Sequence, residues 1–205
     1  MRDGSFWRHG AGRIGLDLEA ARRERRFVFV DGLRGLFLAE PEGGQDIFIV
    51  DAALASVVDA ISSALLHHVD KMPRTLLIID QIDALVATTG ISAEAVQSAL
   101  LSLRKLVDTT VLTFSADDAL IHTQKTRLER EHASLVLAHA HAARTVVSLR
   151  CLDSGPAPDV SGVMRISSHR RNPLHGHHEV SLPPDAEYLY HVAADGSVTV
   201  FERGT

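Results

Sequence analysis

The stretch Arg74-Thr75-Leu76-Leu77-Ile78-Ile79-Asp80 decides the fold class of this chain. Its four consecutive large aliphatic residues predict a strand buried on both faces, as in a parallel sheet that helices cover on each side. Pro73 precedes the stretch and suits the start of a strand, because proline has no N–H to donate to a sheet. Asp80 then falls at the carboxyl edge of the sheet, where α/β proteins place their functional sites.

Strand and helix signals alternate around this stretch and then give way to strands alone. Apolar runs predict strands at 27–31, 47–50, 74–80, 111–114, 145–149 and 162–167, and apolar spacing of three and four predicts helices over about 54–69, 82–87, 92–107 and 127–142. The last two strands, 188–192 and 197–201, flank Asp195-Gly196, a type I′ hairpin signal. We expect residues 1–26 to be irregular with one short helical turn in 19–26, and 115–126 and 169–187 to be loops.

This order predicts one α/β domain over residues 1–205, with a mainly parallel three-layer sheet and a C-terminal antiparallel β-hairpin. A net charge of −5 argues against a protein that binds nucleic acid with its whole surface. The single cysteine excludes a disulfide framework and indicates a reducing compartment. The sequence contains neither an apolar run near the ~20 residues of a membrane span nor a signal peptide.

Asp80 occupies the position at which nucleotide-hydrolysing α/β proteins hold Mg²⁺, but the rest of that machinery is missing from the sequence. The phosphate-binding pattern G-x-x-x-x-G-K-[ST] does not occur. The glycines of 10–15 follow no predicted strand and precede no lysine, which favours a flexible entry loop. A lone carboxylate is a poor Mg²⁺ site, so we expect Asp80 to cap the turn into the 82–87 helix, with Asp83 in its first turn. Asp31 follows another strand, and Gly32 beside it favours a turn aspartate over a catalytic one.

The twelve histidines and the cysteine form no catalytic or metal-binding pattern. His139 and His141 lie on different faces of a helix, and the 175–178 histidines fall in a polar loop. Cys151 has no activating neighbours, which favours a small buried apolar residue. No G-x-S-x-G motif is present. We therefore expect no catalytic residues, no cofactor and no metal, with a histidine-based metal module as the weaker alternative.

Several blocks together resemble the Elongator complex protein 6 family, one of the three RecA-like subunits of the Elongator accessory ring. These blocks are DGSFW (3–7), GRIGLDL (12–18), FVFVDGLRGLF (27–37), LLIIDQIDAL (76–85) and VSLRCLDSGPAPDVSGVMRISS (147–168). The resemblance implies a RecA-like three-layer αβα fold. In that family a strand, a turn and a helix precede the equivalent of DGSFW, so we expect this chain to lack the opening strand, as an N-terminally incomplete gene model or splice form.

The resemblance also implies a function. It implies a non-catalytic subunit that forms a heterohexamer with two RecA-like sister subunits, binds tRNA through the assembled ring, and serves the Elongator core in modifying the wobble uridine of tRNA. It implies a cytoplasmic location, with the nucleus as an additional one. The alternative is an active RecA-like NTPase in which Asp80 holds Mg²⁺ and the phosphate loop is missing from this chain.

Basic residues gather in three clusters, which are Arg22-Arg23-Arg25-Arg26, Lys125 with Arg127 and Arg130, and Arg165 with Arg170 and Arg171. In RecA-like rings, the loop equivalent to 115–126 faces the pore and contacts nucleic acid. The resemblance therefore makes Lys125 and Arg127 the first RNA-contact candidates, followed by Arg170 and Arg171. Solvated surface charge is the alternative for each of them.

Overall fold

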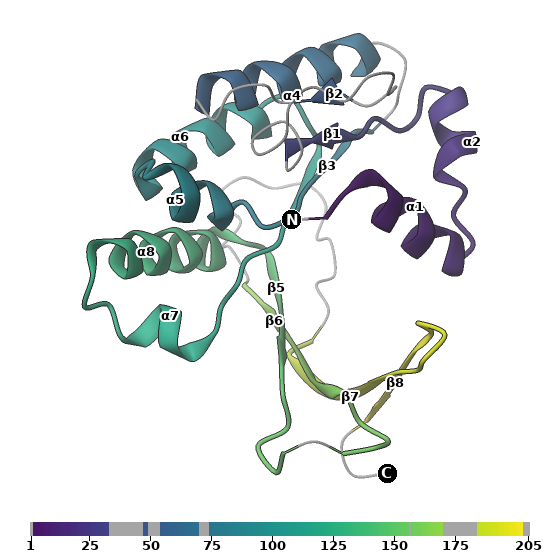
Figure 1. The fold of residues 1–205 in the computed structure, drawn as a ribbon, viewed down its shortest axis with the longest axis vertical. Coiled ribbons are helices and arrows are strands. Elements are labelled where there is room, and N and C mark those ends of the chain that lie inside the picture. Colours follow the sequence, from purple (N-terminus) through teal and green to yellow (C-terminus); the bar gives the residue numbers. More distant parts are fainter. Residues whose placement is uncertain are drawn as a thin grey trace. The chain divides into compact units, whose positions relative to one another are not determined.

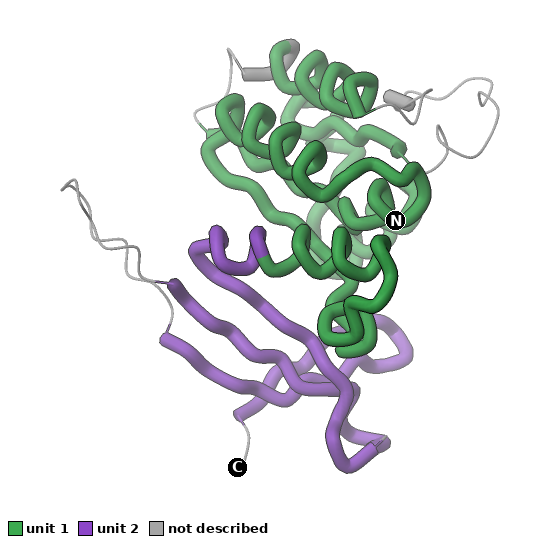
Figure 2. The backbone as a smooth tube through the Cα atoms, turned by 90° about the vertical axis from the view of Figure 1, so that its left-hand side faces the viewer, with its two compact units in different colours: residues 1–137 green, residues 138–205 purple. Residues whose placement is uncertain are grey.

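A computed structural model describes residues 2–32, 47–48, 54–69, 74–155, 157–169 and 184–202. The chain divides into two compact units, residues 1–137 and 138–205 (Figure 2). We describe each unit by itself. The prediction of a single domain over 1–205 stays a prediction.

The elements of both units follow the predicted order, helices and strands first and strands last (Figure 1). They are α1 (Gly4–Arg13), α2 (Leu18–Arg23), β1 (Val30–Asp31), β2 (Ile47–Phe48), α4 (Leu54–Val69), β3 (Leu76–Ile79), α5 (Asp83–Thr89), α6 (Ala93–Arg104), β4 (Thr109–Leu112), α7 (Asp118–His122), α8 (Arg127–Ala142), β5 (Thr145–Arg150), β6 (Gly162–Ser168), β7 (Ala186–Val192) and β8 (Val198–Glu202). Strands β1 and β2 pair in parallel, as do β3 and β4, so the α/β class and the parallel pairing are confirmed.

The helices of unit 1 begin and end where their capping chemistry places them. The Ser92 side chain accepts a hydrogen bond from Ala95 N–H and starts α6. Gly90 ends α5 with a φ of 69°, in the left-handed region that glycine adopts without strain. Helix α5 contains Asp83 in its first turn, as predicted.

The core of unit 1 lies on one face of the β3–β4 pair. It consists of buried side chains from α4, α5, α6 and α8 together with inward residues of the strands: Val30, Val57, Ile79, Ile82, Leu85, Val86, Ala93, Val96, Leu100, Leu112 and Leu135. On the opposite face Leu76, Ile78 and Val111 remain 55%, 53% and 44% exposed. The prediction that β3 would be buried on both faces is therefore not met within the described residues, because only alternate side chains reach the core.

Two predicted irregular stretches contain helices. Residues 1–26 hold α1 as well as the expected turn at α2, because Asp3 and Asp17 accept hydrogen bonds from Phe6 N–H and Ala20 N–H and so cap both helices. The predicted 115–126 loop contains α7. Glycines in 1–26 and polar residues in 115–126 hid these helices, and Asp117 at the start of α7 forms no capping hydrogen bond with its side chain.

Unit 2 is a four-stranded antiparallel sheet in the order β5-β6-β7-β8. Gly162 is required in β6, since a Cβ there would lie 2.5 Å from Arg150 O. The β7–β8 turn is not type I′: Gly196 has a φ of 82°, but Asp195 is not among the residues with positive φ. Gly196 N–H donates to Ala193 O and Ala193 N–H to Ser197 O, which makes a type I turn closed by a left-handed glycine. β7 also begins inside the predicted 169–187 loop, most of which lies outside the described residues.

Among the residues that the structure describes, no helix combines the length and the apolar character needed to span a membrane.

Candidate functional site at the carboxyl edge of β3 and β4

Asp80, the residue that ends the strand on which the fold prediction rests, is tied to β4. Thr113 Oγ1 donates a 2.7 Å hydrogen bond to Asp80 Oδ1 and accepts one of 2.8 Å from Gln81 N–H. Gln81 has a φ of 54°, a left-handed conformation that costs energy for a residue other than glycine. The Thr113 hydroxyl thus holds a strained turn in place. Asp80 thus braces two strand ends, and the N-cap of α5 is Ile82, whose side chain forms no hydrogen bond.

A buried pair lies at the same edge, between α5 and α8. Asp83 and His132 are each 6% exposed, and His132 Nδ1 lies 4.0 Å from Asp83 Oδ2. His132 Nε2 lies 2.8 Å from Ser115 O, and because a carbonyl oxygen only accepts, Nε2 is the donor. Ser115 N–H donates to Asp83 Oδ2 over 3.3 Å. The three residues fasten α5, the segment after β4 and α8 to one another.

A capping box begins α8. Glu129 Oε2 accepts hydrogen bonds from Lys125 N–H (2.7 Å) and Thr126 N–H (2.8 Å), while Glu129 N–H donates to Thr126 Oγ1. The bond from the Thr126 backbone, helped by those from Lys125 N–H and the Thr126 hydroxyl and by the Lys125 charge, lowers the pKa of Glu129. Arg130 Nη1 donates to Lys125 O over 2.9 Å, so this arginine supports the loop.

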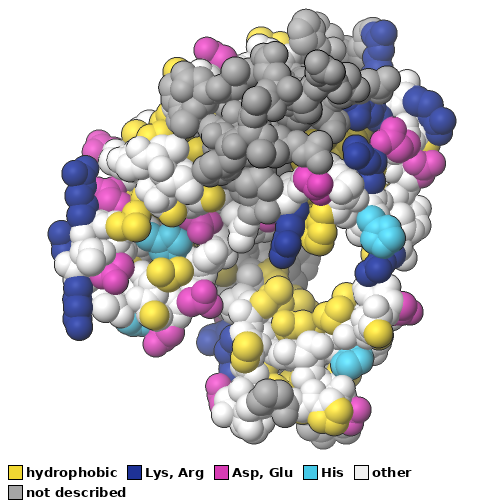
Figure 3. Space-filling model, in the orientation of Figure 1, with side chains coloured by type: hydrophobic (Ala, Val, Ile, Leu, Met, Phe, Trp, Pro, Cys, Tyr) yellow, Lys and Arg dark blue, Asp and Glu magenta, His cyan; other side chains and the backbone are white. Residues whose placement is uncertain are grey.

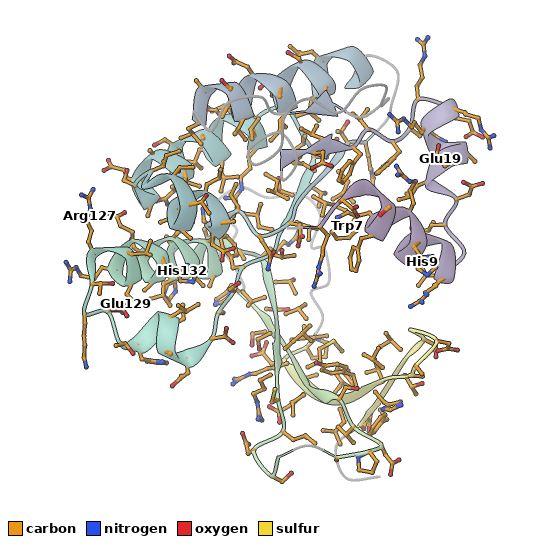
Figure 4. All side chains as sticks on the ribbon, viewed as in Figure 1. Trp7, His9, Glu19, Arg127, Glu129 and His132 are labelled. Atoms are coloured by element: carbon orange, nitrogen blue, oxygen red, sulfur yellow. The ribbon has the colours of Figure 1, made fainter. Side chains whose placement is uncertain are left out.

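The RNA-contact candidates differ in what the structure says of them. Lys125 and Arg127 are exposed at the start of α8, and Figure 4 shows the Arg127 side chain extending away from the helix. Arg127 Nε lies 4.0 Å from Glu131 Oε1, one turn later. Arg170 and Arg171 lie outside the described residues. The structure therefore places two of the four candidates together.

The other described residues with reactive or metal-binding side chains are dispersed. In the described part of the chain, no three His, Cys, Asp or Glu side chains are grouped so that they could hold a metal ion. Asp31 is buried at the end of β1. Cys151 is exposed, so its prediction as a buried residue is wrong; it directly follows β5, whose side chains are also mostly exposed. The histidines at 175, 177 and 178 lie outside the described residues.

Sequence reasoning missed Thr113, Ser115 and His132. A signal for Thr113 existed, since it stands one residue past the β4 run, as Asp80 stands one residue past β3 in the parallel register. His132 gave no signal of its own because a buried structural histidine in a helix has no motif.

Comparison with known proteins decides the family. The model of the family described as Elongation complex protein 6 matches residues 4–192, which is nearly the whole chain. The chain belongs to the Elongation complex protein 6 family. The Elongator complex protein 6 homolog of Schizosaccharomyces pombe is 25% identical over 195 residues, which cover 93% of this chain and 72% of that relative. The resemblance inferred from the sequence blocks is thereby confirmed.

Proposed function

We propose that this chain is a non-catalytic, RecA-like subunit of the Elongator accessory ring. In this proposal it forms a heterohexamer with two RecA-like sister subunits, two copies of each, and works with the Elongator core. The ring binds tRNA and supports modification of the wobble uridine, and the subunit acts in the cytoplasm and also in the nucleus. The observation that carries the proposal is the family match over residues 4–192.

The site at the carboxyl edge supports a structural role. Asp80, the best candidate for a metal ligand, already accepts a hydrogen bond from Thr113, and the described residues group no other ligands around it. The sequence contains no phosphate-binding loop. The part of the sheet edge where a nucleotide hydrolase would work thus braces the fold here.

The half-exposed face of β3–β4 supports assembly with other subunits. Leu76, Ile78 and Val111 present branched apolar side chains that parallel sheets normally cover. In the assembled ring, a sister subunit would cover this face.

Co-expression with the two sister subunits tests the proposal. We expect the three proteins to purify together, and native mass spectrometry to give the mass of a 2:2:2 assembly. Recovery of this chain alone, with the two sisters in a separate complex, would refute the proposal.

The alternative of an active NTPase predicts ATP hydrolysis that depends on Asp80. We expect no turnover above buffer by the purified wild-type chain. If the assembly hydrolyses ATP, the version with Asp80→Ala should retain that activity, because another subunit would supply it. Loss of activity on this substitution, in an assembly of unchanged mass, would favour the enzyme.

A further inference from the structure

Positive charge is concentrated in the first 26 residues. This segment carries seven of the chain's 21 basic residues and four of its 26 acidic ones, so it is basic while the rest of the chain is acidic. All seven cations are arginines: Arg2, Arg8, Arg13, Arg22, Arg23, Arg25 and Arg26. Lys and Arg side chains gather at the upper right of Figure 3, where Figure 1 shows α1 and α2. Arginine matches phosphate groups with a planar, two-pronged donor set that lysine lacks.

Each acidic residue of the segment takes part in a local contact, and the net charge is positive because arginines outnumber carboxylates seven to four. Asp3 and Asp17 cap α1 and α2. Glu19 forms an ion pair with Arg8 that joins the two helices, with 3.5 Å between Arg8 Nε and Glu19 Oε1. Glu24 pairs with Arg26. Arg23, Arg25 and Arg26 are exposed, and Arg22 is half-buried. These four residues form the α2 arginine cluster.

Arg25 occupies a position at which folding alone would favour glycine. Arg26 N–H donates to Ala21 O over 2.8 Å, closing the end of α2, and Arg25 within this turn has a φ of 58°. This left-handed conformation at a helix end is normally taken by glycine, because other residues are strained in it. Strained residues of this kind concentrate at functional sites. The turn directs consecutive arginines outward at the cost of stability.

The neighbouring helix α1 carries two aromatic side chains. Phe6 is half-exposed, Trp7 packs edge-on against it with ring centres 5.8 Å apart, and the Arg2 guanidinium lies 5.1 Å from the centre of the Phe6 ring. Figure 4 shows Trp7 and Glu19 on the neighbouring helices α1 and α2. Exposed arginine and aromatic groups are the chemistry that binds RNA phosphates and stacks on unpaired bases.

From these observations we propose that α1 and α2, with the α2 arginine cluster as the main anchor, form a surface that binds the phosphate backbone of RNA. The proposal rests on the proposed function, to which it adds a contact surface distinct from Lys125 and Arg127. An acidic protein and an anionic membrane are the competing partners of such a surface. The aromatic pair and the exclusive use of arginine favour RNA over both.

The first experiment measures the binding of a fluorescent tRNA transcript against salt concentration, for the full chain alone and in the assembly with its sister subunits. The variant carries Arg22→Gln, Arg23→Gln, Arg25→Gln and Arg26→Gln. The control carries Arg74→Gln, Lys105→Gln, Arg144→Gln and Arg150→Gln, four exposed residues outside this surface and outside the basic clusters, and has the same net charge. We expect the cluster variant to bind tRNA at least about tenfold more weakly. The slope of the logarithm of its binding constant against the logarithm of salt concentration should be shallower by about three. The control should stay within about threefold of the wild type.

Equal loss in the variant and the control, or no loss in either, would overturn the proposal. Native mass spectrometry of the same samples reports assembly. If the ring assembles and the cluster variant binds tRNA normally, the RNA surface is wrong and the proposed function stands. If the ring does not form, the proposed function fails, and binding by the chain alone still decides on the surface.

Vesicles of phosphatidylserine and phosphatidylcholine provide the membrane comparison, and cluster-dependent vesicle binding without cluster-dependent RNA binding would also overturn the proposal.

The second experiment separates binding from folding at Arg25. Arg25→Gly relieves the strained turn, so we expect a higher melting temperature together with about two- to fivefold weaker tRNA binding from the lost charge. Arg25→Lys keeps the charge and should bind nearly as the wild type does. An Arg25→Gly variant that is more stable but binds tRNA as tightly as the wild type would show that Arg25 does not contact RNA.

Discussion

At the scale of single residues, the carboxyl edge of β3–β4 depends on hydrogen bonds that pass from one element to another. Thr113 serves both Asp80 and the strained Gln81, and His132 serves Ser115. Intramolecular hydrogen bonds of this kind each contribute about 0.5–1.5 kcal/mol to stability. The carboxyl edge therefore contributes to folding.

Thr113→Val tests the link between the two strands. The valine has the same shape but neither donates to Asp80 nor accepts from Gln81, so we expect a loss of about 1–2 kcal/mol in the free energy of unfolding. Urea denaturation followed by circular dichroism measures it. Thr109→Val, at the exposed start of β4, is the matched control and should change stability by less than about 0.5 kcal/mol. Equal effects at both positions would contradict the bridging role.

His132→Phe tests the buried fastening of α8. Phenylalanine fills the space but leaves Ser115 O without its buried donor, so we expect a loss of about 2–3 kcal/mol. The control is His141→Phe, on the exposed side of the same helix, with an expected change below about 0.5 kcal/mol. Both values come from denaturant unfolding at neutral pH. A His132→Phe variant as stable as the wild type would show that the Ser115 contact does not matter.

Residue roles were only partly predictable from the sequence. The hydrogen bond between Thr113 and Asp80 was not predicted, because it depends on where β4 ends relative to β3. The left-handed conformation of Arg25 could not be predicted, because no glycine follows α2 to mark the end of the helix.

At the scale of elements, β3 shows how burial divides one strand into two kinds of position. Ile79 packs against the core cluster, whereas its neighbour Ile78 is more than half exposed. The apolar run had predicted burial for both. A continuous aliphatic run thus identifies a strand but does not report which faces are covered within a given unit.

Ile79→Thr and Ile78→Thr form a matched pair that tests this division. Threonine keeps the β-branched shape, so strand preference is constant and only burial differs. We expect Ile79→Thr to cost about 2 kcal/mol of unfolding free energy and Ile78→Thr less than about 0.5 kcal/mol in the isolated chain. Equal losses would mean that both faces are covered in solution.

The capping box of α8 predicts a dependence of stability on pH. Because the pKa of Glu129 is lower in the folded chain than the ordinary 4.5, its carboxylate stabilises the fold above that pH. This contribution is lost as the pH falls through the lowered value. We therefore expect Glu129→Gln to melt below the wild type at pH 7, and the difference to shrink towards pH 3. Thermal melts between pH 3 and 7 measure it, and Glu94→Gln, in the first turn of α6, is the control. A difference that grows on acidification would contradict this.

Elements with strong periodicity were predicted best. The bounds of α8 and the Ser92 start of α6 match, because an apolar stripe and a cap agree there. Helix α1 was missed because its glycines lower helix propensity, which the Asp3 cap outweighs. The hairpin was found but its turn type was wrong, since Asp195-Gly196 also fits a type I turn followed by a left-handed glycine.

At the scale of the whole molecule, the family was predicted from the sequence blocks, and the order of helices and strands from their alternation, which is a long-range pattern that local errors do not erase. The antiparallel part was predicted as a hairpin, whereas the structure has a sheet of four strands, β5 to β8. The segregation of charge into the first 26 residues is equally visible in the sequence. Its placement on two helices joined by the Arg8–Glu19 ion pair became evident only in the structure.

The half-exposed face of β3–β4 has a consequence for the steady-state abundance of this protein. Before assembly, the chain exposes the apolar side chains of Leu76, Ile78 and Val111. Chaperones and proteases recognise exposed apolar surface of this kind. We expect surplus copies to be short-lived, so that the steady level of this polypeptide follows that of its scarcest companion and not the rate of its own synthesis.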